Sequence, residues 1–170
     1  MKEKPAESVQ RKNSIRPAFT IYHANGKGNG SAVAFRVYPA TAGQSGFVQV
    51  ELAMQQTVGD EDRRVYPTFD WKGRILVRLT PIEVGEMLMV LRGASKGIRN
   101  GAGFRHQTDG RISHIRFDHL VEPKDVYCLE VSQETIAGEE RKVSIELTLS
   151  EANAIAAGMS SSMGKLCFGE

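Results

Sequence analysis

Hydrophobic and polar residues alternate along eight short stretches of the chain, and each group of four is followed by a segment of helical periodicity. Turn signals, such as the glycine-rich run 25–30 and the dipeptide at 109–110, separate the stretches. Strands are expected at 18–24, 31–39, 46–56 and 73–79, and again at 103–107, 111–119, 126–134 and 140–147. Helices are expected over about 81–93 and about 149–163. This order predicts an α+β fold.

The two groups are copies of one unit. Residues 74–84 have the sequence RILVRLTPIEV and residues 142–152 have KVSIELTLSEA, so that Thr80 aligns with Thr148. In each copy a threonine is followed three residues later by a glutamate, which is the capping box of a helix start. The sequence therefore predicts two β-β-β-β-α repeats, at about 17–95 and 96–170, within a single domain 17–170 that follows a flexible basic tail, 1–16.

Each predicted helix has an apolar stripe that is expected to face the core. The residues of these stripes are Val84, Met87, Leu88 and Leu91 in the first helix, and Ala152, Ile155, Ala156 and Met159 in the second.

Composition and charge limit the classes of function. The chain has 170 residues, of which 41% are hydrophobic and 25% charged, as in ordinary globular proteins. The net charge is +2, and basic residues within 1–16 account for it, so a nucleic-acid site needs a local concentration of positive charge. No apolar run approaches the roughly 20 residues of a membrane span, so no membrane partner is expected. Cys128 and Cys167 lack a C-x-x-C partner, which suits a reducing compartment, and each is expected to be a buried small hydrophobe. The first residues show neither the apolar stretch of a secretory signal nor the pattern of a transit peptide, so a prokaryotic cytoplasm is expected, with an organelle as the alternative.

Aromatic and basic residues are densest over 63–78, a mixture that suits bases stacking on rings and phosphates meeting cations. Tyr66 is expected to be exposed, whereas Phe69 and Trp71 are either accessible or core aromatics that close the end of the sheet. Alternation places Arg74 and Arg78 opposite the apolar positions of their strand, either as contacts for a ligand or as an ordinary solvated face.

The same alternation predicts one open sheet face that also carries residues of other strands. Gln49 and Gln55 are expected to form hydrogen bonds with bases. Lys27 lies in a glycine-rich turn whose amides can approach a phosphate, unless the turn is only a flexible hairpin loop. The predicted nucleic-acid-binding residues are Lys27, Arg36, Tyr38, Gln49, Gln55, Tyr66, Phe69, Trp71, Lys72, Arg74, Arg78 and Arg116.

Several segments resemble the Whirly family of plant organellar single-stranded-DNA-binding proteins. They are the opening strand at Ile21-Tyr22 with the turn at Lys27-Gly28, the segment FDWKGRILVRLTPIEVGEMLMVLRG (69–93), YCLEVSQ (127–133), the capped second helix, and KLCFG (165–169). The resemblance spans about 18–169; the family's lysine-rich motif is here NGKGNGSAVAF (25–35), with a single lysine.

The resemblance implies two packed antiparallel four-stranded sheets with helices that support contacts between protomers. It also implies homotetramers that bind single-stranded DNA along and between sheet edges with little sequence preference, in replication, repair or recombination. RNA is an alternative ligand, because stacking alone does not distinguish the two sugars.

Two other classes of function compete with this interpretation. The usual enzyme motifs are missing from the sequence, no cofactor or metal is expected, and the acidic run Asp60-Glu61-Asp62 is interpreted as a solvated loop rather than a nuclease site. His114 and His119 are expected to face opposite sides of one strand. The other alternative, an oligomeric scaffold that binds protein, agrees with the nearly neutral body of the chain.

Overall fold

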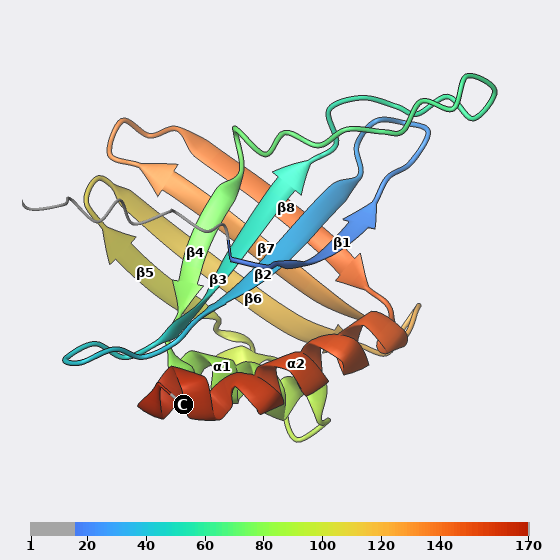
Figure 1. Ribbon diagram of the computed structural model, residues 1–170. Helices are drawn as coiled ribbons and strands as arrows, with labels where there is room; N and C mark the ends of the chain where they lie inside the picture. Colours follow the sequence, from blue (N-terminus) through green and yellow to red (C-terminus); the bar gives the residue numbers. More distant parts are fainter. Residues whose placement is uncertain (1–15, 170) are drawn as a thin grey trace, which may run out of the picture.

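The structure, a computed structural model, describes residues 16–169; of the predicted tail 1–16, only Arg16 lies within them. Two four-stranded antiparallel sheets cross one behind the other, and both helices lie at one end (Figure 1). The first sheet consists of β1 (Phe19–His23), β2 (Ser31–Tyr38), β3 (Phe47–Met54) and β4 (Ile75–Leu79). The second consists of β5 (Phe104–Thr108), β6 (Arg111–Leu120), β7 (Val126–Thr135) and β8 (Glu140–Leu147). Helix α1 spans Pro81–Leu91, a 3₁₀ turn spans Ile98–Gly101, and α2 spans Leu149–Phe168.

Each repeat forms its own sheet, in which consecutive strands pair as a meander. Alternate residues of both sheets point inward and share one hydrophobic core, which contains Val33, Val50 and Val77 from the first sheet and Leu129 from the second. The α+β fold with two packed antiparallel sheets is therefore confirmed.

Both predicted capping boxes are formed. The Thr80 hydroxyl accepts a hydrogen bond from the Glu83 amide at 3.3 Å, and the Glu83 carboxylate accepts one from the Thr80 amide at 2.8 Å. Thr148 and Glu151 repeat this arrangement at the start of α2. These bonds satisfy amide groups that have no partner within the helix, and so they fix where each helix begins.

Helix α2 continues to Phe168, well beyond the predicted end near 163. Gly169 ends the helix in a left-handed conformation, and the loop between β2 and β3 supports the last turn. Its Ala40 and Gly46 amides donate to the carbonyl oxygens of Lys165 and Leu166, at 2.8 and 2.9 Å. Long-range contacts of this kind satisfy the last carbonyls of the helix, and no local sequence signal announces them.

Two histidine–glutamate pairs connect the repeats reciprocally. His106 of β5 contacts the carboxylate of Glu83 at 2.6 Å, and His23 of β1 contacts that of Glu151 at 2.8 Å. Burial raises the pKa of Glu151, but hydrogen bonds from His23 and Thr148 outweigh it, and the net pKa lies below its usual value. The first strand of each repeat is thereby joined to the first turn of the other repeat's helix.

The connection between β3 and β4 forms an arm, residues 55–72, that projects beyond the sheets (Figure 1). Backbone hydrogen bonds join its two sides, among them Gln56 to Thr68 at 2.7 Å and the mutual pair of Asp60 and Val65 at 2.8 Å. No helix within residues 16–169 is long and apolar enough to cross a membrane.

Candidate nucleic-acid interface

The outer face of the first sheet, which points away from the core, carries the predicted basic residues of β2 and β4. The register places Arg36 opposite Gln49, and Gln49 opposite Arg78, so the three side chains form a row across the sheet. Tyr38 and Phe47 form the adjacent pair. Residues that are distant in the sequence thus share one face because strand pairing brings them together.

A carboxylate in the middle of this face fixes two of its arginines. Glu51 is 5% exposed and accepts hydrogen bonds from Nε of Arg36 at 3.0 Å and from Nε2 of Gln49 at 2.8 Å. Its other oxygen lies 2.7 Å from Nε of Arg74. Burial raises the pKa of Glu51, but the hydrogen bonds from Gln49 and Arg36 and the arginine charges outweigh it, and the net pKa is lowered.

Each of these guanidinium groups is also held at a second point. Nη1 of Arg74 donates to the Trp71 carbonyl at 2.7 Å, and Nη1 of Arg36 donates to the Arg16 carbonyl. These contacts hold the two arginines in fixed orientations on the sheet surface. The buried negative charge of Glu51 also cancels part of the positive potential of the two arginines.

Aromatic side chains lie at both ends of the face. At one end, Tyr38 and Phe47 stack with their ring centroids 4.6 Å apart, and the guanidinium of Arg78 lies 4.8 Å from the centroid of Phe47. At the other end, Tyr22 packs against Phe69 and Trp71, at centroid distances of 5.3 and 6.3 Å. The face thus combines fixed cations with two groups of rings, the combination used to bind single strands.

The residues of the arm divide between exposed and half-buried positions. Tyr66 is 84% exposed, as predicted, and Lys72 is exposed as well. Phe69 and Trp71 are half-buried and lie outside the main core, packed on Tyr22, so neither alternative describes them fully. They cover the outer face at the base of the arm and leave part of each ring accessible.

The two predicted glutamines, Gln49 and Gln55, are both buried and form hydrogen bonds within the protein. Gln55 is 7% exposed; its Oε1 accepts from the amides of Asn25 and Gly30, and its Nε2 donates to the carbonyls of Asn25 and Thr57. Both polar atoms of Gln55 are thus bonded within the protein, where they close the 25–30 turn, and the binding of bases by Gln55 stays a prediction. Gln49 lies on the outer face but is buried and donates to Glu51.

Most amides of the glycine-rich turn are bonded within the protein. The amides of Lys27 and Asn29 donate to the side-chain oxygen of Asn25 at 3.0 and 3.3 Å, and those of Gly28 and Gly30 are also bonded internally. The turn is therefore held by Asn25, and the side chain of Lys27 is exposed beside it.

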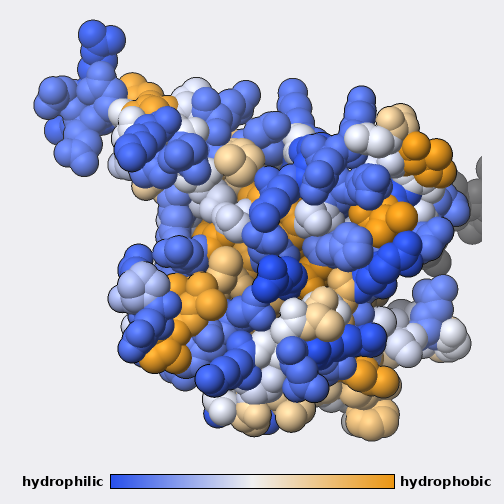
Figure 2. Space-filling view, turned by 180° about the vertical axis from the view of Figure 1, so that it is seen from behind, coloured by the Kyte–Doolittle hydropathy of each residue, from blue (hydrophilic) through white to orange (hydrophobic). Residues whose placement is uncertain are grey.

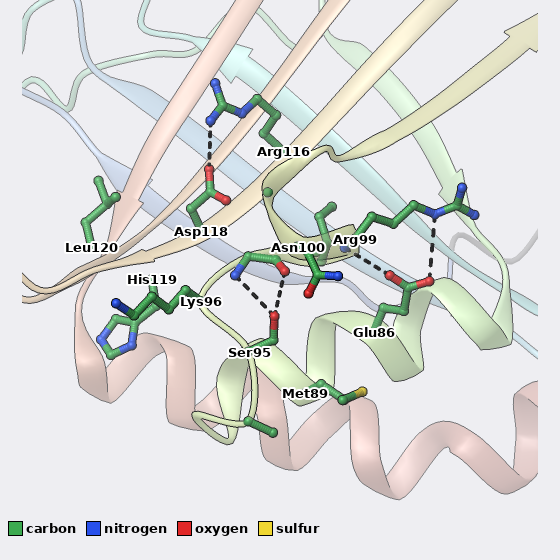
Figure 3. A pocket seen from close by; sticks show the side chains of 14 residues that line it. Glu86, Met89, Ser95, Lys96, Arg99, Asn100, Arg116, Asp118, His119 and Leu120 are labelled. Carbon is green, nitrogen blue, oxygen red and sulfur yellow. Dashed lines mark hydrogen bonds and ion pairs between the residues drawn. The ribbon is translucent and has the colours of Figure 1, made fainter.

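Arg116 does not share the face of the other predicted arginines. It belongs to β6, which pairs only with strands of the second sheet, and its Nη2 lies 3.3 Å from a carboxylate oxygen of Asp118. Together they line a cavity of about 740 Å³ beside the 3₁₀ turn, where Arg99 pairs in turn with Glu86 (Figure 3). The alternation of β6 was predicted correctly, but alternation does not indicate to which sheet a strand belongs.

The strands of the second sheet place no Phe, Tyr or Trp side chain on its outer face. The aromatic residues of its strands, Phe104, Phe117 and Tyr127, are all buried in the core. Seen from that side, the surface is largely hydrophilic, with hydrophobic residues in separate patches (Figure 2). Two basic residues there are paired with acids, Lys142 with Glu130 at 2.8 Å and Arg116 with Asp118 at 3.3 Å.

Three residues of the candidate site were missed by the sequence interpretation. They are Tyr22, Phe47 and Glu51, and the strand alternation that placed Arg36 on the face would have placed them there too.

The prediction that both cysteines are buried needs correction, because Cys128 is half-buried on the outer side of β7 and Cys167 is exposed near the end of α2. Residues 16–169 contain no group of side chains suited to hold a metal ion.

The architecture defines a class: proteins with two crossed antiparallel four-stranded sheets and two helices at one end. Solved structures of this class that are similar to the chain are those of WHY1 and WHY3 from Arabidopsis thaliana and of the plant transcriptional regulator PBF-2, with TM-scores of 0.67, 0.65 and 0.66. The sequence identities are 14, 13 and 14%, over 91, 90 and 90% of this chain and 87, 89 and 83% of the others. The chain therefore has a Whirly-like fold, as the sequence resemblance implied. The sequence matches no model of a protein family, and a comparison with curated proteins gives no significant relative.

Proposed function

We propose that the protein binds single-stranded DNA on the outer face of the first sheet, largely without regard to sequence. The observation that carries the proposal is the coexistence of two fixed arginines, Arg36 and Arg74, with aromatic groups at both ends of the same face. Phosphates would meet the guanidinium groups while unpaired bases stack on accessible rings.

The aromatic rings on the face favour a single strand over a duplex. A duplex keeps its bases stacked on one another, whereas the rings of Tyr22, Tyr38 and Trp71 need bases that are free to stack on protein. Duplex recognition commonly uses a helix or ribbon in the major groove, and both helices here lie at the end of the sheets (Figure 1). Stacking is tolerant of sequence because every base has a flat face.

Finer aspects of the proposal rest on the Whirly resemblance. They are the action of the protein as a homotetramer, its non-enzymatic character, and its role in protecting DNA during replication, repair or recombination. RNA is the alternative ligand of the same face, and an assay with matched DNA and RNA strands distinguishes the two.

Fluorescence polarisation of one labelled sequence, as a single strand and as a duplex, across a salt series tests the proposal. We expect tighter binding of the single strand, weakening as salt rises. Arg78→Ala should weaken binding and reduce the salt slope, whereas Lys124→Ala, which removes the same charge from a loop of the second sheet, should change neither. Equal binding of the single strand and the duplex would refute the proposal, and so would the absence of binding to either at low salt. Binding of a protein partner that does not weaken as salt rises would favour the scaffold function instead.

A further inference from the structure

An apolar groove lies between helix α2 and the chain that leads into β1. Its volume is about 550 Å³, within the roughly 300–1,000 Å³ that is usual for small-molecule sites. Phe35, Val37 and Val48 line it from the first sheet, and Ile155 and Met159 line it from the helix. All five belong to the hydrophobic core or pack against it, so the groove leads from the surface to the core.

The rim of the groove offers apolar surface and open space. Phe19 of β1 lines it and is 48% exposed. On the helix side, the hydroxyls of Ser161 and Ser162 donate to the Gly158 carbonyl at 3.0 and 2.7 Å, so their protons are used within α2. A Cβ atom added at Gly158 would meet no atom within 4 Å. Exposed apolar surface that continues into a hollow is typical of ligand-binding grooves.

The charged residues of the groove are all basic. Arg16 and Lys165 line it, and its lining within residues 16–169 includes no aspartate or glutamate. Neither of the two forms an ion pair with another side chain of that part of the chain. Lys165 is exposed in the last turn of α2. A ligand that matches both the apolar groove and this positive charge has an apolar body and an anionic head.

We propose that the groove binds an anionic amphiphile, a fatty acid, whose acyl chain packs on Phe35 and Ile155 and whose carboxylate pairs with Lys165. Burial of the methylene groups supplies the affinity, and the ammonium group selects the sign of the head group. Residues 1–15 of the chain suit the groove less well, because their four basic and two acidic residues give a net charge of +2. Arg16 and Lys165 would repel a segment of that charge.

Isothermal titration calorimetry with octanoate, decanoate and dodecanoate, each below its critical micelle concentration, tests the proposal. We expect saturable binding of one molecule per chain, with a dissociation constant that falls about fourfold for each added methylene. Dodecyltrimethylammonium has the same alkyl chain and the opposite charge. It should bind much more weakly, because Arg16 and Lys165 repel its head group.

Two variants with matched controls locate the site. Gly158→Leu fills the groove and should weaken dodecanoate binding at least about tenfold, the effect of losing contact with about two methylenes. Gly85→Leu makes the same change in α1, where a Cβ would also meet no atom within 4 Å, and should bind as the wild type does. Lys165→Gln should weaken binding about two- to fivefold, whereas Lys124→Gln should not change it. Thermal melts establish that all variants are folded.

The absence of saturable carboxylate binding would overturn the proposal, and so would equal binding of dodecyltrimethylammonium or wild-type affinity in Gly158→Leu. A changed oligomeric state of Gly158→Leu in size-exclusion chromatography, together with no carboxylate binding by the wild type, would show instead that the groove is a contact between copies of the chain. The groove lies on the core side of the first sheet, so none of these results bears on DNA binding at the outer face.

Discussion

Glu51 controls the electrostatics of the outer face because it is buried between Arg36 and Arg74. A carboxylate in this position has two opposing effects. It fixes the guanidinium groups and lowers the unfavourable free energy of partly burying Arg36, and it repels the phosphates that those groups would attract. Stability and affinity therefore place opposite demands on this residue.

Replacing Glu51 by Gln should separate these effects. We expect a salt slope for single-strand binding that is steeper by about 0.7, because the face gains one unit of positive charge. We also expect a loss of about 1–3 kcal/mol in the free energy of unfolding, because a buried charge-assisted network loses a partner. Salt titrations and urea unfolding measure the two quantities, and a variant with wild-type slope and stability would contradict this account of Glu51.

The lowered pKa of Glu51 gives its stabilising contribution a defined pH range. Because the folded pKa lies below the unfolded one, the contribution is complete above the unfolded value of about 4.3 and is lost as pH falls through the folded value. Urea unfolding of Glu51→Gln should therefore depend less on pH than that of the wild type in the acid range below about 4.3. Parallel pH profiles of the two proteins would argue against the lowered pKa.

At the scale of elements, the last turn of α2 depends on the loop between β2 and β3. A Cβ atom added at Gly46 would lie 2.5 Å from the Tyr38 carbonyl oxygen and 2.9 Å from Cα of Leu166, both backbone atoms. The loop would have to move away from the helix, and the two hydrogen bonds that cap it would be lost with that movement.

Gly46→Ala should consequently destabilise the protein by about 1–3 kcal/mol and increase amide exchange over the last turn of α2. Gly85 provides a matched control, because it lies within α1 and a Cβ there would meet no atom within 4 Å. Gly85→Ala should stabilise the protein by about 0.5–1 kcal/mol, the difference in helix propensity. Hydrogen exchange and urea unfolding check both, and unchanged exchange near Leu166 in Gly46→Ala would contradict the role of the loop.

At the scale of the whole molecule, local patterns predict the elements well, but not the long-range pairing between them. Alternation and capping boxes follow from neighbouring residues, and so the strands and the helix starts at Thr80 and Thr148 could be predicted from the sequence. Whether a strand such as β6, with Arg116, joins the first or the second sheet depends on partners distant in the chain, and alternation is the same in both cases.

In the candidate site, too, positions that depend on neighbouring residues could be predicted, and positions that depend on tertiary contacts could not. Arg36, Tyr38 and Arg78 were placed on the outer face because that placement needs only strand period. The burial of Gln55 follows from the folding of the 25–30 turn over it, and the hydrogen bond from Gln133 to the Leu76 carbonyl exists only once the two sheets are packed. Such features depend on the tertiary structure and carry no signal within a short window of sequence.

The central claim is that single strands bind the outer face of the first sheet, and the intrinsic fluorescence of Trp71 tests it most directly. Trp71 is the single tryptophan of the chain and packs on Tyr22 at that face. Titration with unlabelled single-stranded DNA should give saturable quenching that weakens as salt rises, with a much smaller change for a duplex of the same sequence. Tryptophan emission that stays constant while polarisation reports binding would place the strand elsewhere, and equal quenching by duplex would contradict the single-strand preference.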